Sequence, residues 1–249
     1  MATIHEPRVR RLPDAESLGE AAASDIAAAL IRRLETRPGV RMIFASAPSQ
    51  EATLRSLAGW PGIDWARVTA FHMDEYLGLA PGAPQLFGSW LRATLFDRVP
   101  MGAVHLIEPG HDPRQTAGAY AGLLAAAPID LVCLGIGVNG HLAFNDPPAD
   151  LRDPALVRIV ELDEVSRRQQ VDDGCFASLA GVPCQAITLT VPALLSADEV
   201  YCMVPGERKR AAVTAALHGP VEGRLPASAL RTHPRCTVYV DEGSAPDVP

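Results

Sequence analysis

Short apolar runs alternate along this chain with longer segments in which apolar residues recur every three or four positions. The short runs predict buried strands at Arg41–Ala45, Arg67–Phe71, Ile129–Leu134, Leu156–Glu161, Gln185–Leu189, Glu199–Val204 and Thr237–Val240. The longer segments predict helices at Ala15–Thr36, Ser49–Ala58, Gln85–Arg98, Pro113–Ala127, Asp163–Cys175, Gly206–Leu217 and Pro226–Leu230. Because strands and helices alternate, we expect an α/β fold with a mainly parallel, doubly wound sheet.

The pattern offers no clear place for a domain boundary. The chain has 249 residues, 48% of them hydrophobic, which is enough to bury one full-sized core, and no repeat or Pro/Ser-rich linker divides it. We therefore expect a single domain over residues 1–249, a modified Rossmann-like unit with its core at about 15–242. We also expect Leu79–Pro84 to be a loop and Gly243–Pro249 to be a frayed tail.

Charge and composition exclude several classes of protein. The net charge is −7 and the arginines are scattered, so no basic stripe exists to follow a nucleic-acid backbone. The N-terminal segment has no signal-peptide core, and no stretch reaches the ~20 apolar residues that span a bilayer. We expect a cytoplasmic protein with no nucleic-acid partner and no membrane contact.

The five cysteines are spaced neither as metal ligands nor as a disulfide framework. Most of them lie within apolar runs. We therefore expect reduced core residues at Cys133, Cys175, Cys184, Cys202 and Cys236.

Segments with unusual polar residues follow three of the predicted strands. They are Ser46–Gln50, His72–Gly78 and Gly135–Pro148. In open parallel sheets, ligands bind in the crevice beyond the carboxyl ends of the strands, where helix N-termini also point. These segments are therefore the candidate parts of a functional site.

The segment Gly135–Pro148 contains the pattern G-x-G-x-x-G, which also occurs in dinucleotide-binding proteins. Glu161 even lies at a spacing that would suit a ribose contact. The context is wrong, however, because Pro147 and Pro148 leave no room for the helix that the third glycine should open. We therefore expect no nicotinamide cofactor.

The same glycine-rich turn brings backbone amides close to a ligand and presents His141, Asn145 and Asp146 on a short loop. Histidine titrates near neutral pH, and a nearby carboxylate can orient it and raise its basicity. These residues predict a site of proton transfer. The alternative is a buried histidine that binds a backbone carbonyl.

In His72–Gly78 an apolar strand runs into two adjacent carboxylates, Asp74 and Glu75. Neighbouring side chains of a strand point to opposite faces, so one acid can enter the crevice while the other points away or caps a helix. We interpret one as catalytic and the other as supporting it; the alternative is a turn with solvated acids. No second histidine stands at ligand spacing from His72, so we expect no metal site.

Together these segments resemble the glucosamine-6-phosphate deaminase family. The resemblance rests on MDEYLGL (Met73–Leu79) and on GIGVNGHLAFNDP (Gly135–Pro147), in the order and at about the separation of the family's signature motifs. It continues through Ile187–Val213 and Ala229–Glu242, and so covers about residues 15–242.

The resemblance implies an aldose-to-ketose isomerisation with loss of the C2 amine, which gives fructose 6-phosphate and ammonia without metal or organic cofactor. It implies that Asp74 moves the proton between C2 and C1, and that His141 assists ring opening, oriented by Asn139 and Asp146. Lys209, the only lysine of the chain, stands where the family has a phosphate-binding lysine. The candidate substrate-binding residues are Ser46, Ser49, Gln50, Glu75, Gly137, Gly140 and Lys209.

The chain departs from the family pattern at three places. ASAPSQ (Ala45–Gln50) replaces a Thr-Gly-Gly-Thr type loop, although serine hydroxyls before a helix can still bind phosphate. Asn139 replaces an aspartate and carries no charge, while Asp146 replaces a glutamate and reaches one methylene less far. The phosphate-clamping arginine has no clear counterpart; Arg167 or Arg168 could substitute from a shifted position.

Other functions stay open at this point. A 6-phosphogluconolactonase-like hydrolase or another sugar-phosphate isomerase would use the same pocket, and a sugar-phosphate sensor without catalysis would need neither Asp74 nor His141. In each case the partner is a small phosphosugar. The sequence is compatible with assembly into a homo-oligomer.

Overall fold

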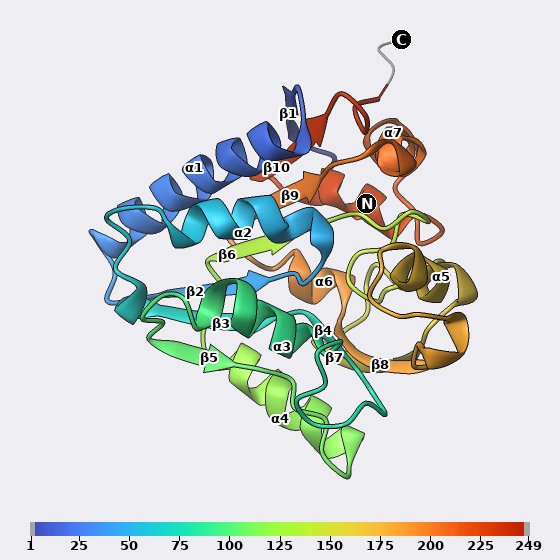
Figure 1. The fold of residues 1–249 in the computed structure, drawn as a ribbon. Helices are drawn as coiled ribbons and strands as arrows, with labels where there is room; N and C mark the ends of the chain where they lie inside the picture. Colours follow the sequence, from blue (N-terminus) through green and yellow to red (C-terminus); the bar gives the residue numbers. More distant parts are fainter. Residues whose placement is uncertain (1–2, 247–249) are drawn as a thin grey trace.

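Seven parallel strands form the central sheet of the computed structural model, which describes residues 3–246 (Figure 1). In spatial order they are β1 (Arg8–Leu12), β10 (Cys236–Asp241), β9 (Glu199–Val204), β6 (Leu131–Leu134), β2 (Val40–Phe44), β3 (Val68–His72) and β5 (Ala103–His105). The chain builds outward from β2 through β3 to β5, and then from β6 through β9 to β10 on the other side. The strand order therefore reverses between β2 and β6, which is where open sheets of this kind bind ligands.

Helices cover both faces of this sheet, and each face has its own apolar core. On one face lie α1 (Ala15–Leu34), α2 (Glu51–Ala58) and α3 (Phe87–Leu91), which continues as a π-helical turn, Arg92–Phe96. The other face carries α4 (Pro113–Ala125), α6 (Val191–Leu194) and α7 (Arg210–His218). Strand β2 shows the alternation, since Met42 and Phe44 pack with α1 while Ile43 packs with the opposite core.

A small antiparallel sheet stands beside the main one. It consists of β4 (Asp74–Tyr76), β8 (Gln185–Leu189) and β7 (Val157–Glu161), and α5 (Glu164–Asp172) follows β7. Its core is aromatic: the ring of Tyr76 lies 4.7 Å from Phe87, 5.3 Å from Phe144 and 5.4 Å from Phe176, measured between centroids. This sheet positions Asp74 next to the carboxyl edge of the main sheet.

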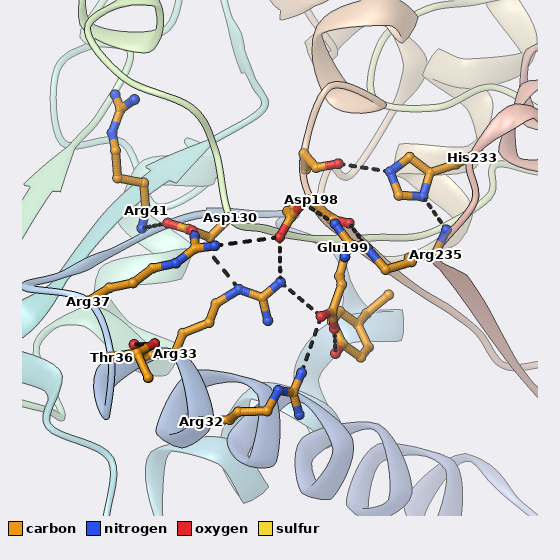
Figure 2. A network of polar contacts seen from close by, with 12 residues as sticks. Arg32, Arg33, Thr36, Arg37, Arg41, Asp130, Asp198, Glu199, His233 and Arg235 are labelled. Atoms are coloured by element: carbon orange, nitrogen blue, oxygen red, sulfur yellow. Dashed lines mark hydrogen bonds and ion pairs between the residues drawn. The ribbon is translucent and has the colours of Figure 1, made fainter.

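Arginines and carboxylates form an ion-pair network at the amino-terminal edge of the main sheet (Figure 2). Arg33 from α1 lies 2.8 Å from Glu199 and 3.0 Å from Asp198, both at the start of β9. Asp130, just before β6, pairs with Arg37 and accepts a 2.8 Å hydrogen bond from the backbone N–H of Arg41. The network fastens the end of α1 to the beginnings of β2, β6 and β9.

The structure confirms the mainly parallel, doubly wound α/β fold and the bounds expected for β8 and β9. The expected helix Pro226–Leu230 is a 3-10 helix, Pro226–Thr232. The strands β1, β4 and β5 and the short helix α6 were not predicted. Strand β1 escapes an apolar-run search because it is an edge strand of mostly exposed residues, RVRRL, which pairs with β10.

Two smaller expectations are wrong. The expected frayed tail is fixed at Ser244, whose N–H donates to Asp241 at 2.8 Å, and Ala245 is buried; residues 247–249 lie outside the described part. All five cysteines are free, but Cys184 is exposed and Cys175 is half-buried, because both lie in loops of the small-sheet side. Among residues 3–246, no helix is both long and apolar enough to cross a membrane.

Candidate active site

The three candidate segments meet at the carboxyl edge of the sheet. Ser46–Gln50 follows β2, Gly135 follows β6, and Lys209 follows β9, and these three strands are neighbours. His72–Gly78 leaves β3 and becomes β4 of the small sheet. The candidate site therefore lies at the carboxyl ends of the strands, next to the point where the strand order reverses.

Two adjoining clefts open at this edge, with volumes of about 340 and 390 Å³. Both are lined by Ala47, Pro48, Gln169 and Asp173, so they share the wall between the loop after β2 and helix α5. The first continues past Ser46 to Phe87, Trp90 and Cys175. The second continues past Ser49 and Val138 to Arg208 and Lys209. Asp74 and His141 are not among the residues that line these two clefts; they are 6% and 8% exposed.

His141 is the centre of a hydrogen-bonded network. Its Nδ1 lies 2.9 Å from Ser166 Oγ and 3.3 Å from Asp146 Oδ1, and Ser166 donates a short hydrogen bond to Asp146. Asn139 accepts a hydrogen bond from the His141 backbone N–H and donates to Asp146. Burial opposes ionisation of Asp146, but hydrogen bonds from His141 and Ser166 outweigh it and lower its pKa to about 2. Asp146 is thus a carboxylate that orients the imidazole.

Two glycines of the loop are required by geometry. A Cβ at Gly137 would lie 2.2 Å from the Nε2 and Cε1 atoms of His141, so a side chain there would displace the ring. Gly140 has a φ of 82°, in the region that favours glycine, and a Cβ would also collide with Leu225. The Nε2 edge of His141 therefore lies against the glycine turn. As the sequence suggested, no helix opens after Gly140 within the described segment 135–156.

Asp74 is a buried carboxyl without a hydrogen-bond partner among residues 3–246. Burial, and next the charge of Glu75, raise its pKa well above the usual range. Strand β8 joins it to the histidine loop, because Leu189 donates to Met73 O and accepts from the Asn145 side chain. A group with these properties suits proton abstraction from carbon.

Glu75 has the other role that the sequence allowed. Its carboxylate accepts backbone hydrogen bonds from Tyr76 at 3.0 Å, Phe87 at 3.0 Å and Gly88 at 2.8 Å. Glu75 thereby caps the N-terminus of α3, on the face of β4 opposite to that of Asp74. Burial raises the pKa of Glu75 to about 7, although these hydrogen bonds act to lower it. Glu75 lines a separate cleft of about 530 Å³ and neither of the two shared clefts.

The phosphate-loop candidates differ in their positions. Ser46 and Ser49 line the clefts, whereas Gln50 is fully buried and binds Met203 O at 3.3 Å. Lys209 lines the second cleft opposite Asp173. Burial lowers the pKa of Lys209 to about 8, with Asp173 opposing the shift. The site therefore holds a cation that is still protonated at neutral pH.

Neither of the two proposed replacement arginines reaches the clefts. Arg167 donates to the carbonyls of Leu179 and Val182, and Arg168 pairs with Glu164. Arg208 does line the second of the two shared clefts. It pairs at 2.7 Å with Asp172, a contact that the sequence did not suggest.

The sequence missed the contribution of α5 to the site. Ser166 contacts His141, Gln169 accepts a hydrogen bond from Val138 N–H at 3.0 Å, and Asp173 lines both clefts. The spacing Asp163-x-x-Ser166 does signal a helix start, and Asp163 accepts from Ser166 N–H at 2.7 Å. It gives no sign that the serine faces a histidine 25 residues earlier.

His72 is fully buried at the end of β3. Its Nε2 accepts a hydrogen bond from Ile107 N–H at 2.7 Å, and burial lowers its pKa to about 3, so the ring is neutral. Within residues 3–246, no group of three or more His, Cys, Asp or Glu side chains is arranged to hold a metal ion.

Residues 13–239 match the family described as glucosamine-6-phosphate isomerases/6-phosphogluconolactonase. A glucosamine-6-phosphate deaminase of Rhodopirellula baltica is 32% identical over 98% of this chain and 97% of its own length. One from Arthrobacter sp. is 34% identical over 94% of this chain and 90% of its own length.

Solved structures give the same result. A monomeric glucosamine-6-phosphate deaminase superposes with a TM-score of 0.88 at 25% identity, covering 95% of this chain and 98% of its own. A 6-phosphogluconolactonase from Thermotoga maritima superposes with a TM-score of 0.77 at 20% identity, covering 95% of this chain and all of its own, and shares the fold. The chain belongs to the family of glucosamine-6-phosphate isomerases and 6-phosphogluconolactonases.

Proposed function

We propose that this chain is a deaminating aldose–ketose isomerase that converts glucosamine 6-phosphate, or a closely related aminosugar phosphate, to fructose 6-phosphate and ammonia. The observation that carries the proposal is the buried, unpaired carboxyl of Asp74, tied through β8 to the loop of His141. Relatives that are 32% to 36% identical bear the name of this activity, which supports it.

Each group has a role in the proposed reaction. His141 moves a proton between the C1 hydroxyl and the ring oxygen, oriented by Asn139 and Asp146, and so opens the sugar ring. Asp74 then takes the C2 proton while O1 gains a proton, which gives an enolamine; Asp74 returns its proton to C1 while the nitrogen loses one, so that the net change is one proton moved from C2 to C1 and one from nitrogen to O1. Water adds to the resulting C2 imine, and the nitrogen leaves as ammonia. The raised pKa of Asp74 suits it to both taking and giving the proton.

The substrate phosphate would bind between the loop after β2 and the helix after β9. Ser46 and Ser49 provide hydroxyl donors and Lys209 provides the charge. The turn of Gly137 and Gly140 leaves space for the imidazole and brings backbone amides near the sugar. Gln50 and Glu75 contribute by fixing the loop and α3 around this pocket.

The second candidate function is lactone hydrolysis, because the matched family includes 6-phosphogluconolactonases. In that reaction the loop histidine acts on an ester, and Asp74 is not needed as a base at carbon. Hydrolysis forms no bond between hydrogen and carbon, so it leaves no isotope in the product. The two functions can therefore be separated by one solvent experiment.

The experiment is to incubate the purified protein with glucosamine 6-phosphate in D₂O and measure ammonia, with mass and NMR analysis of the sugar. We expect ammonia and fructose 6-phosphate with deuterium at C1. A parallel incubation with 6-phosphogluconolactone should show no rate above the spontaneous one. Absence of ammonia together with rapid lactone hydrolysis would replace the proposal by the second candidate. Binding of the sugar phosphate without formation of either product would indicate a sensor without catalysis.

A cytoplasmic location and assembly into a homo-oligomer stay predictions. Fractionation of the cells that make the protein and light scattering of the purified chain would test them.

A further inference from the structure

Ser166 lies between the imidazole of His141 and the carboxylate of Asp146. Its Oγ is 2.9 Å from His141 Nδ1 and makes a short hydrogen bond to Asp146 Oδ1, and the side chain is fully buried. We propose that Ser166 is a positioning residue that completes the histidine–carboxylate contact and fixes the proton of His141 on Nδ1. The part of this proposal that concerns rate rests on the proposed deaminase function; the part that concerns the imidazole does not.

The direction of each hydrogen bond follows from the available protons. Asp146 is ionised, because its pKa is about 2, and can only accept. The single hydroxyl proton of Ser166 therefore points to Asp146. The lone pairs of Oγ are left to accept: the side-chain amide of Asn139 donates to it at 3.5 Å, and the Nδ1 atom of His141 lies nearer, at 2.9 Å. Nδ1 must then carry the ring proton, which leaves Nε2 unprotonated toward the glycine turn at Gly137.

Asp146 cannot hold the ring by itself at this distance. Its nearer oxygen is 3.3 Å from Nδ1, which is long for a charge-assisted hydrogen bond. Asn139 contributes a backbone contact and an amide donor at 3.3 Å to Asp146, but no charge. The serine hydroxyl closes the gap, so an imidazolium formed during ring opening would be stabilised through Ser166 by the charge of Asp146.

Ser166 also makes α5 part of the catalytic geometry. The residue is the third of the helix, and Asp163 caps the helix by accepting from its N–H at 2.7 Å. One turn later Gln169 binds the backbone of Val138 and lines both clefts. The position of the helix at the substrate cleft is thus linked to the position of the hydroxyl at the histidine.

The test compares Ser166→Ala, Ser166→Thr and Ser17→Ala. Ser17 is a matched control, since it is also the third residue of a helix and donates its N–H to the capping Asp14 at 2.7 Å. We expect Ser166→Ala to lower kcat about 10- to 100-fold with little change in KM, because the hydroxyl acts on the histidine and not on the sugar. Ser166→Thr should restore most of kcat, and Ser17→Ala should leave it unchanged. Melting curves show whether each variant is folded.

The second measurement needs no substrate. In ¹⁵N NMR of the ligand-free protein, the His141 ring should show a protonated Nδ1 and a free Nε2 in the wild type and in Ser166→Thr, and a mixture of tautomers in Ser166→Ala. An unchanged tautomer in folded Ser166→Ala, or a kcat within about twofold of wild type, overturns the proposal. If the wild type releases no ammonia, the deaminase function fails, and the tautomer still decides the role of Ser166.

Discussion

The two edges of the central sheet use charge in opposite ways. At the amino-terminal edge the carboxylates face arginines: Asp130 pairs with Arg37, and Asp198 and Glu199 pair with Arg33 (Figure 2). At the carboxyl edge, Asp74 has no cation within ion-pair distance among residues 3–246. Arg33 and Asp130 are as buried as Asp74, so burial by itself does not separate the two edges.

The pKa values record this difference. Burial raises the pKa of Glu199, but hydrogen bonds from Tyr201 and Arg33 outweigh it and the net shift is downward. The pKa of Asp74 is raised, first by burial and then by the charge of Glu75. A carboxylate paired with an arginine stabilises the folded state, whereas an unpaired carboxyl with a raised pKa is suited to proton transfer. Substitutions at the two edges should therefore separate stability from activity.

The largest effect is expected from Asp74→Asn. The amide cannot take a proton from C2, so kcat should fall by about 10³- to 10⁴-fold. The free energy of unfolding should stay the same or rise, because a buried ionisable group without a partner is removed. Deamination rates and urea melts measure the two quantities. The exposed Asp97→Asn is the matched control, and equal activity of the two variants would exclude Asp74 as the base.

Asp130→Ala should lower stability and leave activity unchanged, the reverse of the result expected for Asp74→Asn. It removes the partner of Arg37 and the acceptor of the Arg41 N–H, and it leaves the buried guanidinium of Arg33 less compensated. We expect the free energy of unfolding to fall by about 3 kcal/mol, since breaking a buried pair costs about 3–5 kcal/mol. The kcat of the folded variant should match the wild type. A large loss of kcat at a temperature where the variant is fully folded would contradict the separation of the edges.

The sequence predicts the five inner strands of the main sheet, because they are mostly apolar and their runs are easy to see, but it misses the two edge strands β1 and β5. Val40–Phe44 and Glu199–Val204 are examples. It does not predict β4, since DEY is a charged triplet that becomes a strand only by pairing with β8. The antiparallel sheet that positions Asp74 is therefore a tertiary feature without a local signal.

The candidate site, too, was predicted only where its residues form a local motif. The glycines, His141 and Asp146 form a recognisable motif, and the structure brings them together. Ser166 is distant in sequence and its local pattern indicates only a helix cap. Whether Arg167, Arg168 or Arg208 reaches the cleft depends on which carbonyl or carboxylate binds each one, and a run of arginines does not encode that choice.

Lys209→Met should have a moderate effect, on binding. It removes the cleft cation, so KM for the sugar phosphate should rise about 10- to 30-fold with a smaller change in kcat. In the wild type, KM should also rise as the pH increases through about 8, because the ammonium loses its proton there. Arg208→Gln is the control, since Arg208 is already paired with Asp172. A KM that rises equally in both variants would mean that the arginine also binds the phosphate.

The smallest effect is expected at Asp146, on the dependence of the unfolding free energy on acid pH. Its folded pKa of about 2 lies below the ordinary value of 3.8, so its carboxylate form favours the folded state. This stabilisation is present above about pH 4 and is lost as the pH falls through 2. The difference in unfolding free energy between the wild type and Asp146→Asn should be larger at pH 6 than at pH 2 by about 1–2 kcal/mol.

Glu199→Gln provides the comparison at the other edge, because the pKa of Glu199 is also lowered. Both variants should lose acid-dependent stability, but only Asp146→Asn should also lower kcat, since only Asp146 orients His141. Urea melts between pH 2 and 7 and deamination rates at neutral pH measure the two effects. If Asp146→Asn kept full activity while it lost the pH-dependent stability, Asp146 would belong with the structural carboxylates of the amino-terminal edge, and the division between the edges would fail at this residue.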